Sequence, residues 1–267
     1  MLCYERVNVD LVIFIMLAFT LAIDRFSPLL AFILLELSAM LKLFSIFGLG
    51  YLLRETRKRF FLLFSLGVSI FIAYLTLIWR NTNWMVMQAP KGSLLNFGVS
   101  AMGYRVFEIT DSKAYSDLTT ILMFALAFLI IAYVLYLSDK LNLSAENNRY
   151  IDAFRIGALI YFGAFLQGAA FNYKFMFLIF AIPQIVLWIK PDGQLRRAGA
   201  WSLAFVLFSC WGMILSRIFP LNLAFALDEA ANWLAFAYLL FLFLCSCPDW
   251  VRLEIRTFFK RYERKAA

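Results

Sequence analysis

Apolar residues run almost unbroken along this chain, interrupted only by short charged segments. The pattern predicts about eight membrane-crossing segments, because a helix of roughly 20 apolar residues spans the hydrocarbon core of a bilayer. Their expected bounds are residues 9–23, 27–53, 60–79, 118–138, 153–172, 174–189, 199–217 and 231–247. The second run is overlong for one helix and carries Glu36 and Lys42 inside it.

The same pattern decides the fold class. Backbone amides in hydrocarbon must be satisfied internally, so spanning segments are either helices or the strands of a closed barrel. The apolar runs here are continuous and lack the alternation of polarity that barrel strands show. We therefore expect an all-α, polytopic transmembrane helical bundle over residues 1–248, in the cell (inner or plasma) membrane.

Lysines and arginines gather in a few of the breaks between spans. The segment 54–59 is strongly basic, Lys190 with residues 196–197 forms a second basic segment, and the tail from residue 249 forms a third. Basic loops remain on the cytoplasmic side of a membrane. With about eight spans, this predicts that both termini are cytoplasmic. The segments expected to face outward are 24–26, 80–117, 172–173 and 218–230.

The tail, residues 249–267, is amphipathic at helical spacing. Val251, Ile255 and Phe258 share one face, whereas Arg252 and Arg256 share another. This pattern is typical of an interfacial helix that lies on the inner leaflet, although a helix that binds a protein partner has the same pattern.

Composition narrows the function classes. Of the 267 residues, 64% are hydrophobic, and 25 basic residues against 17 acidic ones leave a net charge of +8. Beside membrane spans this excess indicates contact with anionic lipid, not nucleic acid. The chain has no His, which excludes His-based acid–base chemistry and the commonest zinc and haem ligation. We expect no metal and no cofactor.

The outer segment 80–117 is the longest stretch without a span. It contains Trp84, Met87, Phe97 and Tyr104 and is too apolar for a free linker. Long loops are usually functional or disordered, and this composition is not that of a disordered segment. We expect a lid or short re-entrant helices on the outer face of the bundle.

Ionisable groups at membrane depth are costly and are therefore functional candidates. Lys42 could neutralise an anionic ligand such as a phosphate; alternatively, it snorkels to the cytoplasmic interface or pairs with a carboxylate on another helix. Asp152 and Arg155 are three residues apart, so a structural pair is expected. Asp24 lies in a tight turn, so we expect its carboxylate to be a solvated turn residue.

The most informative polar cluster is the expected outer hairpin between the fifth and sixth spans. It contains Gln167, Asn172, Tyr173 and Lys174, and Pro183-Gln184 follows inside the next apolar run. A tight turn accounts for Asn172 but not for the phenol of Tyr173 and the ammonium of Lys174 that follow it. A proline inside a helix leaves a carbonyl without its partner, which shapes cavities in membrane helices.

This hairpin resembles a segment of the multi-spanning GT-C-type glycosyltransferases, particularly their bacterial alpha-mannosyltransferase-like branch, which reads Asn-x-Asp-Tyr-Arg, an apolar run and Pro-Gln. Three further pieces resemble that family in the same order. They are Glu5-Arg-Val-Asn8-Val-Asp10 before a span, Leu41-Lys42-Leu-Phe44, and Asn96-Phe97-Gly98 in the outer segment. The resemblance covers residues 5–184.

The resemblance implies sugar transfer from a polyprenyl-phosphate donor without a metal, with an aspartate of the first outer loop as base. It also implies that Gln167, Asn172, Tyr173, Lys174 and Lys42 bind the lipid phosphate. Asn172 stands where the family has Asp, and Lys174 where it has Arg.

The chain begins where the second half of that family begins, so the family's base would be missing. Within this chain, Asp24, Asp111 and Asp117 are the candidates for a replacement base. Alternatively, a partner chain supplies it, or the protein transports lipid-linked sugars or serves as an accessory subunit without chemistry.

Overall fold

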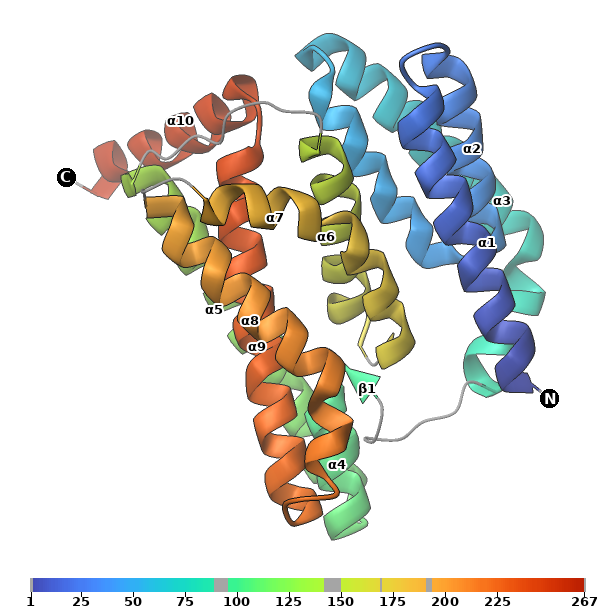
Figure 1. Cartoon of the computed structure of the whole chain (residues 1–267), viewed down its shortest axis with the longest axis vertical. Coiled ribbons are helices and arrows are strands. Elements are labelled where there is room, and N and C mark those ends of the chain that lie inside the picture. The colour runs from blue at the N-terminus through green and yellow to red at the C-terminus, as the bar shows by residue number, and fades with distance from the viewer. Residues whose placement is uncertain (1, 89–95, 142–149, 169, 191–193, 267) are drawn as a thin grey trace.

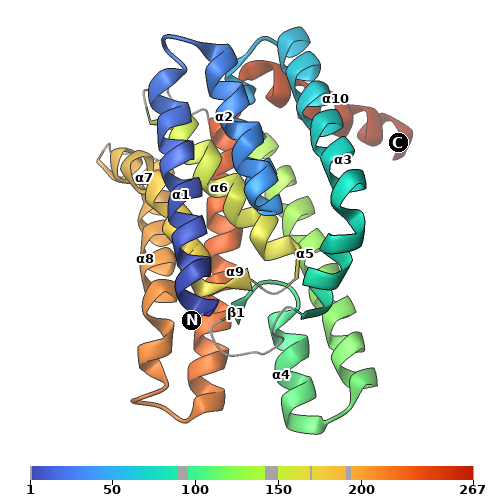
Figure 2. The ribbon, with the colours of Figure 1, turned by 90° about the vertical axis from the view of Figure 1, so that its right-hand side faces the viewer.

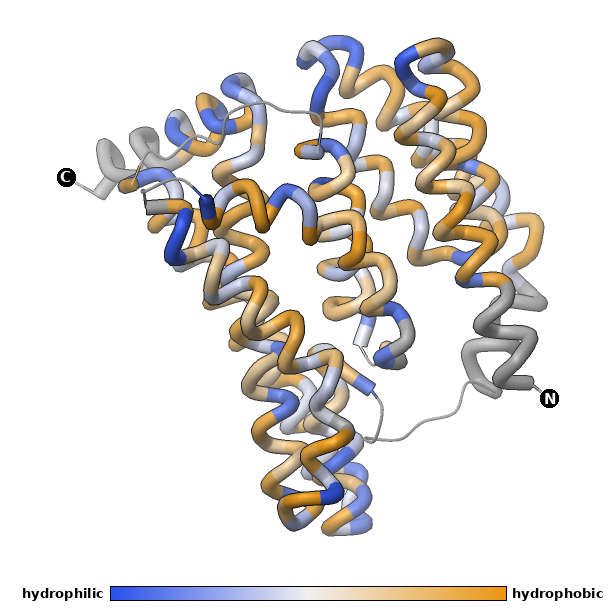
Figure 3. Tube along the Cα trace, viewed as in Figure 1, coloured by the Kyte–Doolittle hydropathy of each residue, from blue (hydrophilic) through white to orange (hydrophobic). Residues whose placement is uncertain are grey.

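The computed structural model describes residues 2–88, 96–141, 150–168, 170–190 and 194–266. The described chain is all-α apart from one two-residue strand pair (Figure 1). Within it, three helices are long and apolar enough to cross a membrane, namely Arg57–Trp79, Lys113–Leu141 and Leu221–Ser246. Figure 3 shows apolar residues along most of each helix, whereas many hydrophilic residues lie near the helix ends.

The N-terminal part is a set of antiparallel segments. Helix α1 (Leu2–Ile23) is followed by α2 (Pro28–Leu41), the 3₁₀ helix η1 (Leu43–Arg54) and α3 (Arg57–Gln88). Ser27 accepts a hydrogen bond from the amide of Leu30 and Pro28 occupies the first turn, so α2 has a well-formed start. Helix α2 ends at Lys42, whose backbone is extended.

This arrangement corrects the expected second span. Residues 27–53 do not form one helix, because α2 and η1 turn back on each other at Lys42. Arg54 consequently forms an ion pair with Asp24, at the opposite end of the run. The expectation that segments 24–26 and 54–59 lie on opposite membrane faces is therefore wrong. Figure 1 shows α10 near the end of the bundle that carries Arg54, whereas the start of α1 lies away from that end.

The C-terminal part is built around α6 and α9. Strand β1 (Asn96–Phe97) leads into α4 (Ala101–Thr110) and α5 (Lys113–Leu141), and α6 (Ile151–Leu166) follows. Strand β2 (Ala170–Phe171), the 3₁₀ helix η2 (Asn172–Phe180) and α7 (Ile182–Ile189) replace the expected single span 174–189. Helices α8 (Gln194–Leu215), α9 (Leu221–Ser246) and α10 (Asp249–Ala266) complete the chain.

Pro183 is the physical reason for part of this difference. It lies in the first turn of α7, where a proline needs no amide partner, so it begins a helix and does not interrupt one. Residues 80–117 likewise differ from a simple lid, because α3 continues to Gln88 and α4 packs on α5. Arg105 ties α4 to α9 through a 2.5 Å hydrogen bond to Asn222.

The end of the bundle that carries Arg54 is held by charged side chains. Asp152 accepts a hydrogen bond from Arg155 at 3.1 Å, which confirms the expected pair, and lies 3.5 Å from Arg54. Arg155 also donates to the carbonyl of Ser246 and so joins α6 to the end of α9. The tail forms the expected helix, and α10 is tied to α3 by the Arg57–Glu254 ion pair at 2.5 Å (Figure 2).

Two segments far apart in sequence meet at a glycine. Gly98 has φ of 112°, and a Cβ there would lie 2.4 Å from the carbonyl oxygen of Gly168. We expect Gly98→Ala to lower the free energy of unfolding by about 1–3 kcal/mol, because alanine is strained at this positive φ and its Cβ would collide with backbone atoms. Thermal denaturation in detergent, followed by circular dichroism, measures this change.

Gly199→Ala is the matched control. Gly199 lies inside α8, and the nearest atom to its added Cβ would be a side-chain carbon of Ile189 at 3.2 Å, with the carbonyl oxygen of Ile185 at 3.4 Å. Alanine favours helix more than glycine does, so this variant should unfold no earlier than the original protein. Equal destabilisation of the two variants would contradict the role given to Gly98.

Candidate functional site

An ion pair joins the first half of α1 to the turn between α2 and η1. The Lys42 ammonium lies 2.7 Å from both carboxylate oxygens of Asp10. The Asp10 side chain is 1% exposed and that of Lys42 is 23% exposed, so the pair is largely removed from solvent. Of the alternatives for Lys42, the structure shows pairing with a carboxylate on another helix.

A second cation lies beside this pair. The Lys174 Nζ atom is 4.9 Å from the centroid of the Phe44 ring, and the Lys42 Nζ atom is 5.9 Å from the same centroid. Lys174 also interacts electrostatically with Asp10 and Lys42. Two ammonium groups and one carboxylate among the described side chains therefore lie around one aromatic ring. An aromatic face attracts cations, so Phe44 helps to hold both.

Packing of aromatic rings fixes the segments that carry these groups. Phe44 packs edge-on against Phe177 of η2, with 5.3 Å between ring centroids. Phe14 of α1 stacks on Phe180 of η2 at 4.5 Å. The three segments that supply Asp10, Lys42 and Lys174 therefore share one aromatic core.

A short strand pair brings the outer segment to the same hairpin. Asn96 pairs with Phe171 and Phe97 with Ala170 in antiparallel register. The buried Phe97 ring stacks on Phe175 of η2 at 4.5 Å. Four pieces of sequence that lie far apart in the chain, around residues 10, 42, 97 and 172, are consequently adjacent.

The other predicted binding residues lie at or beside the hairpin. Asn172 is the first residue of η2, is half-buried, and has an amide oxygen without a hydrogen-bond partner among the described residues. Gln167 lies at the end of α6 and lines a cavity of about 400 Å³. The side chain of Tyr173 lies outside the described part of the structure.

The three candidate bases are not brought to this cluster. Asp24 is buried in the ion pair with Arg54, about 20 Å along α1 from Asp10 at 1.5 Å per residue. Asp111 ends α4 in a left-handed conformation, with φ of 52°, and Asp117 is exposed in the first turns of α5. Figure 1 shows the connection between α4 and α5 at the far end of the molecule from α10.

Sequence reasoning missed two sets of polar residues. Asp10 was assigned no site role, although its place before an apolar run made it a possible partner for Lys42. Asp228, Glu229 and Asn232 lie inside α9, because this helix begins at Leu221 and not at the expected residue 231. All three are buried, and each has side-chain oxygens unpaired within the described structure. Their spacing, which places them on neighbouring turns of one helix, could have revealed them.

Comparisons with protein families, with curated proteins and with solved structures find no match to this chain. Its chemistry is therefore inferred from the site itself. Among the described residues, no group of three or more acidic or cysteine side chains is placed to hold a metal ion. The cluster at Phe44 brings two ammonium groups together in a largely apolar surrounding, and charge-assisted hydrogen bonds from such groups suit an organic anion such as a phosphate ester.

The Asp10–Lys42 pair should be sensitive to the loss of one partner. We expect Asp10→Asn to lower the free energy of unfolding by about 3–5 kcal/mol, because it removes the buried carboxylate that both carboxylate-to-Lys42 hydrogen bonds depend on. Thermal denaturation in detergent measures this effect. The double variant Asp10→Asn with Lys42→Met should regain part of the loss.

The control is Asp117→Asn, which removes an exposed carboxylate of the same kind and should change stability little. If Asp10→Asn proves as harmless as this control, the ion pair does not hold α1 to the turn at Lys42.

Proposed function

We propose that this chain is an integral membrane protein that binds the phosphate of a polyprenyl-phosphate-linked sugar at Lys174 and Lys42. The observation that carries the proposal is the convergence of these two lysines and Asp10 around Phe44. Two ammonium groups at this depth are costly unless anions stabilise them, and the cluster presents Lys174 beside the pair of Lys42 and Asp10. A phosphate supplies that anion and accepts hydrogen bonds from both ammonium groups.

The proposed orientation places the Arg54 end of the bundle in the cytoplasm. Arg25, Arg54 and residues 57–59 all lie at this end, with the basic helix α10 beside them. Basic residues at the end of a span favour the cytoplasmic side. Helix α2 has 14 residues, so Lys42 is about 20 Å from this end, in the outer part of the membrane. The N-terminal end of α1 then faces outward.

An apolar cavity next to the cluster suits a polyprenyl chain. The cavity of about 400 Å³ is lined by Phe47 of η1 and by apolar residues of α5, α6 and α9, with Gln167 at the end of α6. In a 3₁₀ helix, residues three apart lie on the same face. Phe47 therefore follows Phe44 along one face of η1 and connects the cationic cluster to the cavity.

The geometry also supports the resemblance to GT-C-type transferases in one respect. The pieces around Asp10, Lys42, Phe97 and Asn172, which resemble that family separately in the sequence, meet in space. The one carboxylate described at the cluster is held by Lys42, and so cannot readily accept a proton from an acceptor hydroxyl. We therefore propose donor binding by this chain and sugar transfer only when a partner chain supplies the base.

Binding of polyprenyl phosphate to the purified protein in detergent tests the first part. We expect Lys174→Met to weaken binding by about tenfold or more, since a hydrogen bond to a charged group contributes about 1.5–3 kcal/mol. Lys113→Met, which removes an exposed lysine at the start of α5, is the control and should bind normally. Equal affinity for polyprenyl phosphate and the uncharged polyprenol would contradict phosphate recognition.

Reconstitution in liposomes with a labelled lipid-linked sugar tests the second part. The chain alone should bind the donor and form no new glycoside. If a new glycoside forms, the accessory role is wrong, and replacing Asp24, Asp111 and Asp117 by Asn then tests whether one of them is the base. Counter-flow of labelled donor without a new glycoside would identify a transporter.

A further inference from the structure

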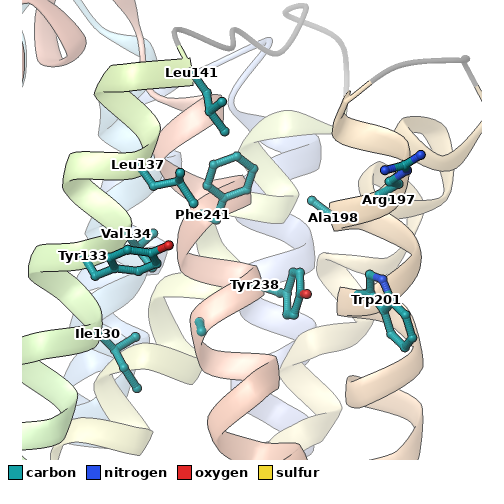
Figure 4. Close-up of a pocket in the computed structure, with 11 residues that line it drawn as sticks. Ile130, Tyr133, Val134, Leu137, Leu141, Arg197, Ala198, Trp201, Tyr238 and Phe241 are labelled. Atoms are coloured by element: carbon teal, nitrogen blue, oxygen red, sulfur yellow. The ribbon is translucent and has the colours of Figure 1, made fainter.

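A second lipid-facing feature lies on the other side of α9 from the small cavity. It is a groove of about 910 Å³ whose walls are α5 and α8 and whose floor is α9 (Figure 4). Its lining is apolar and aromatic: α5 supplies Val134 and Leu137, α9 supplies Tyr238, and α8 supplies Trp201. We call this feature the α5–α8 groove.

The groove has one charged residue at its rim. Arg197 lies in the first turn of α8, at the same end of the groove as Leu141, the last residue of α5 (Figure 4). Its side chain is exposed. The helix dipole disfavours a cation at the start of a helix, so helix stability does not explain an arginine there.

The groove lies within the membrane-facing part of the molecule. Helices α5 and α9 are both long and apolar enough to cross a membrane, and Tyr133 and Trp201 at the walls are more than half exposed. Arg197 is toward the end of the bundle proposed to be cytoplasmic. Basic positions between transmembrane helices on that side bind anionic lipid headgroups.

We propose that the α5–α8 groove binds an anionic glycerophospholipid. Its acyl chains lie between α5 and α8 against Tyr238 and Phe241, and its phosphate contacts the Arg197 guanidinium. The volume is near the upper end of ligand sites, which reach about 1,000 Å³, and is suited to a bulky apolar ligand. The guanidinium supplies two parallel donors for phosphate oxygens. This site is separate from the cluster at Lys174; the proposal rests on the proposed orientation of the bundle but not on phosphate binding at that cluster.

Two variants separate the headgroup contact from the apolar groove. Arg197→Gln removes the charge, and its control Arg217→Gln removes an exposed arginine just beyond the other end of α8. Ala237→Trp fills the floor of the groove, and its control Ala125→Trp places the same bulk on an exposed position of α5 outside the lining. The full chain is used in each case.

Native mass spectrometry of the protein in detergent, titrated with phosphatidylglycerol or phosphatidylcholine, measures the bound lipid. We expect a preference for phosphatidylglycerol that Arg197→Gln reduces about fivefold, in line with one basic contact at a membrane surface. Ala237→Trp should remove retention of both lipids. Both controls should behave like the original protein, and polyprenyl phosphate binding should be unaffected by Arg197→Gln.

Three results would overturn the proposal. The first is equal retention of the two lipids by the original protein, and the second is an identical effect of Arg197→Gln and Arg217→Gln. The third is a lipid-independent dimer that Ala237→Trp disrupts, which would make the groove a contact between two copies of this chain. Loss of polyprenyl phosphate binding in Arg197→Gln would instead assign the groove to that lipid.

Discussion

The ion pair between Asp10 and Lys42 is the interaction on which the N-terminal half of the bundle depends. It allows a lysine to lie in the middle of a 27-residue apolar run, where α2 ends and η1 turns back along it. Removing one partner of such a buried pair leaves an uncompensated charge and is strongly destabilising. The turn at Lys42 places the Phe44 ring close to the ammonium groups of Lys42 and Lys174. It also lets η1 run back along α2, so that Arg54 pairs with Asp24. The position of the proposed phosphate site and the closure of the opposite end thus follow from one contact.

The parts of the fold that depend on apolar length alone were predictable. The spans expected at 60–79 and 118–138 correspond to α3 and α5, because a long, uniformly apolar segment has one stable form in a membrane. The run 27–53 was not predictable in this way, since hydropathy does not distinguish one long helix from two short antiparallel segments. Lys42 at the turn was a signal, as were Gly48 and Gly50, where added Cβ atoms would collide with Leu35 and Leu159.

The candidate site was predictable in its residues more than in its geometry. Lys42 and Lys174 were both singled out, but the expected topology kept them at different depths, and only the turn after α2 brings them together. The role of Asp10 depends on a contact across 32 residues that no local spacing reveals. Glu36, the acidic residue of the run 27–53, is buried against α3 at Gly67, and the hydropathy of the run gave no indication of this contact.

The turn at Lys42 places residues 25 and 58 on the same side of the membrane, and this arrangement can be measured directly. In a variant without native cysteines, single cysteines at Arg25 and at Lys58 are labelled with a membrane-impermeant maleimide in sealed, right-side-out vesicles and in opened ones. The account predicts that both positions react only when the vesicles are opened, because Asp24 and Arg54 lie together at the end of the bundle that we propose to be cytoplasmic. Labelling of position 25 from outside and of position 58 from inside would show that residues 27–53 cross the membrane once. The shared site at Phe44 would then be contradicted.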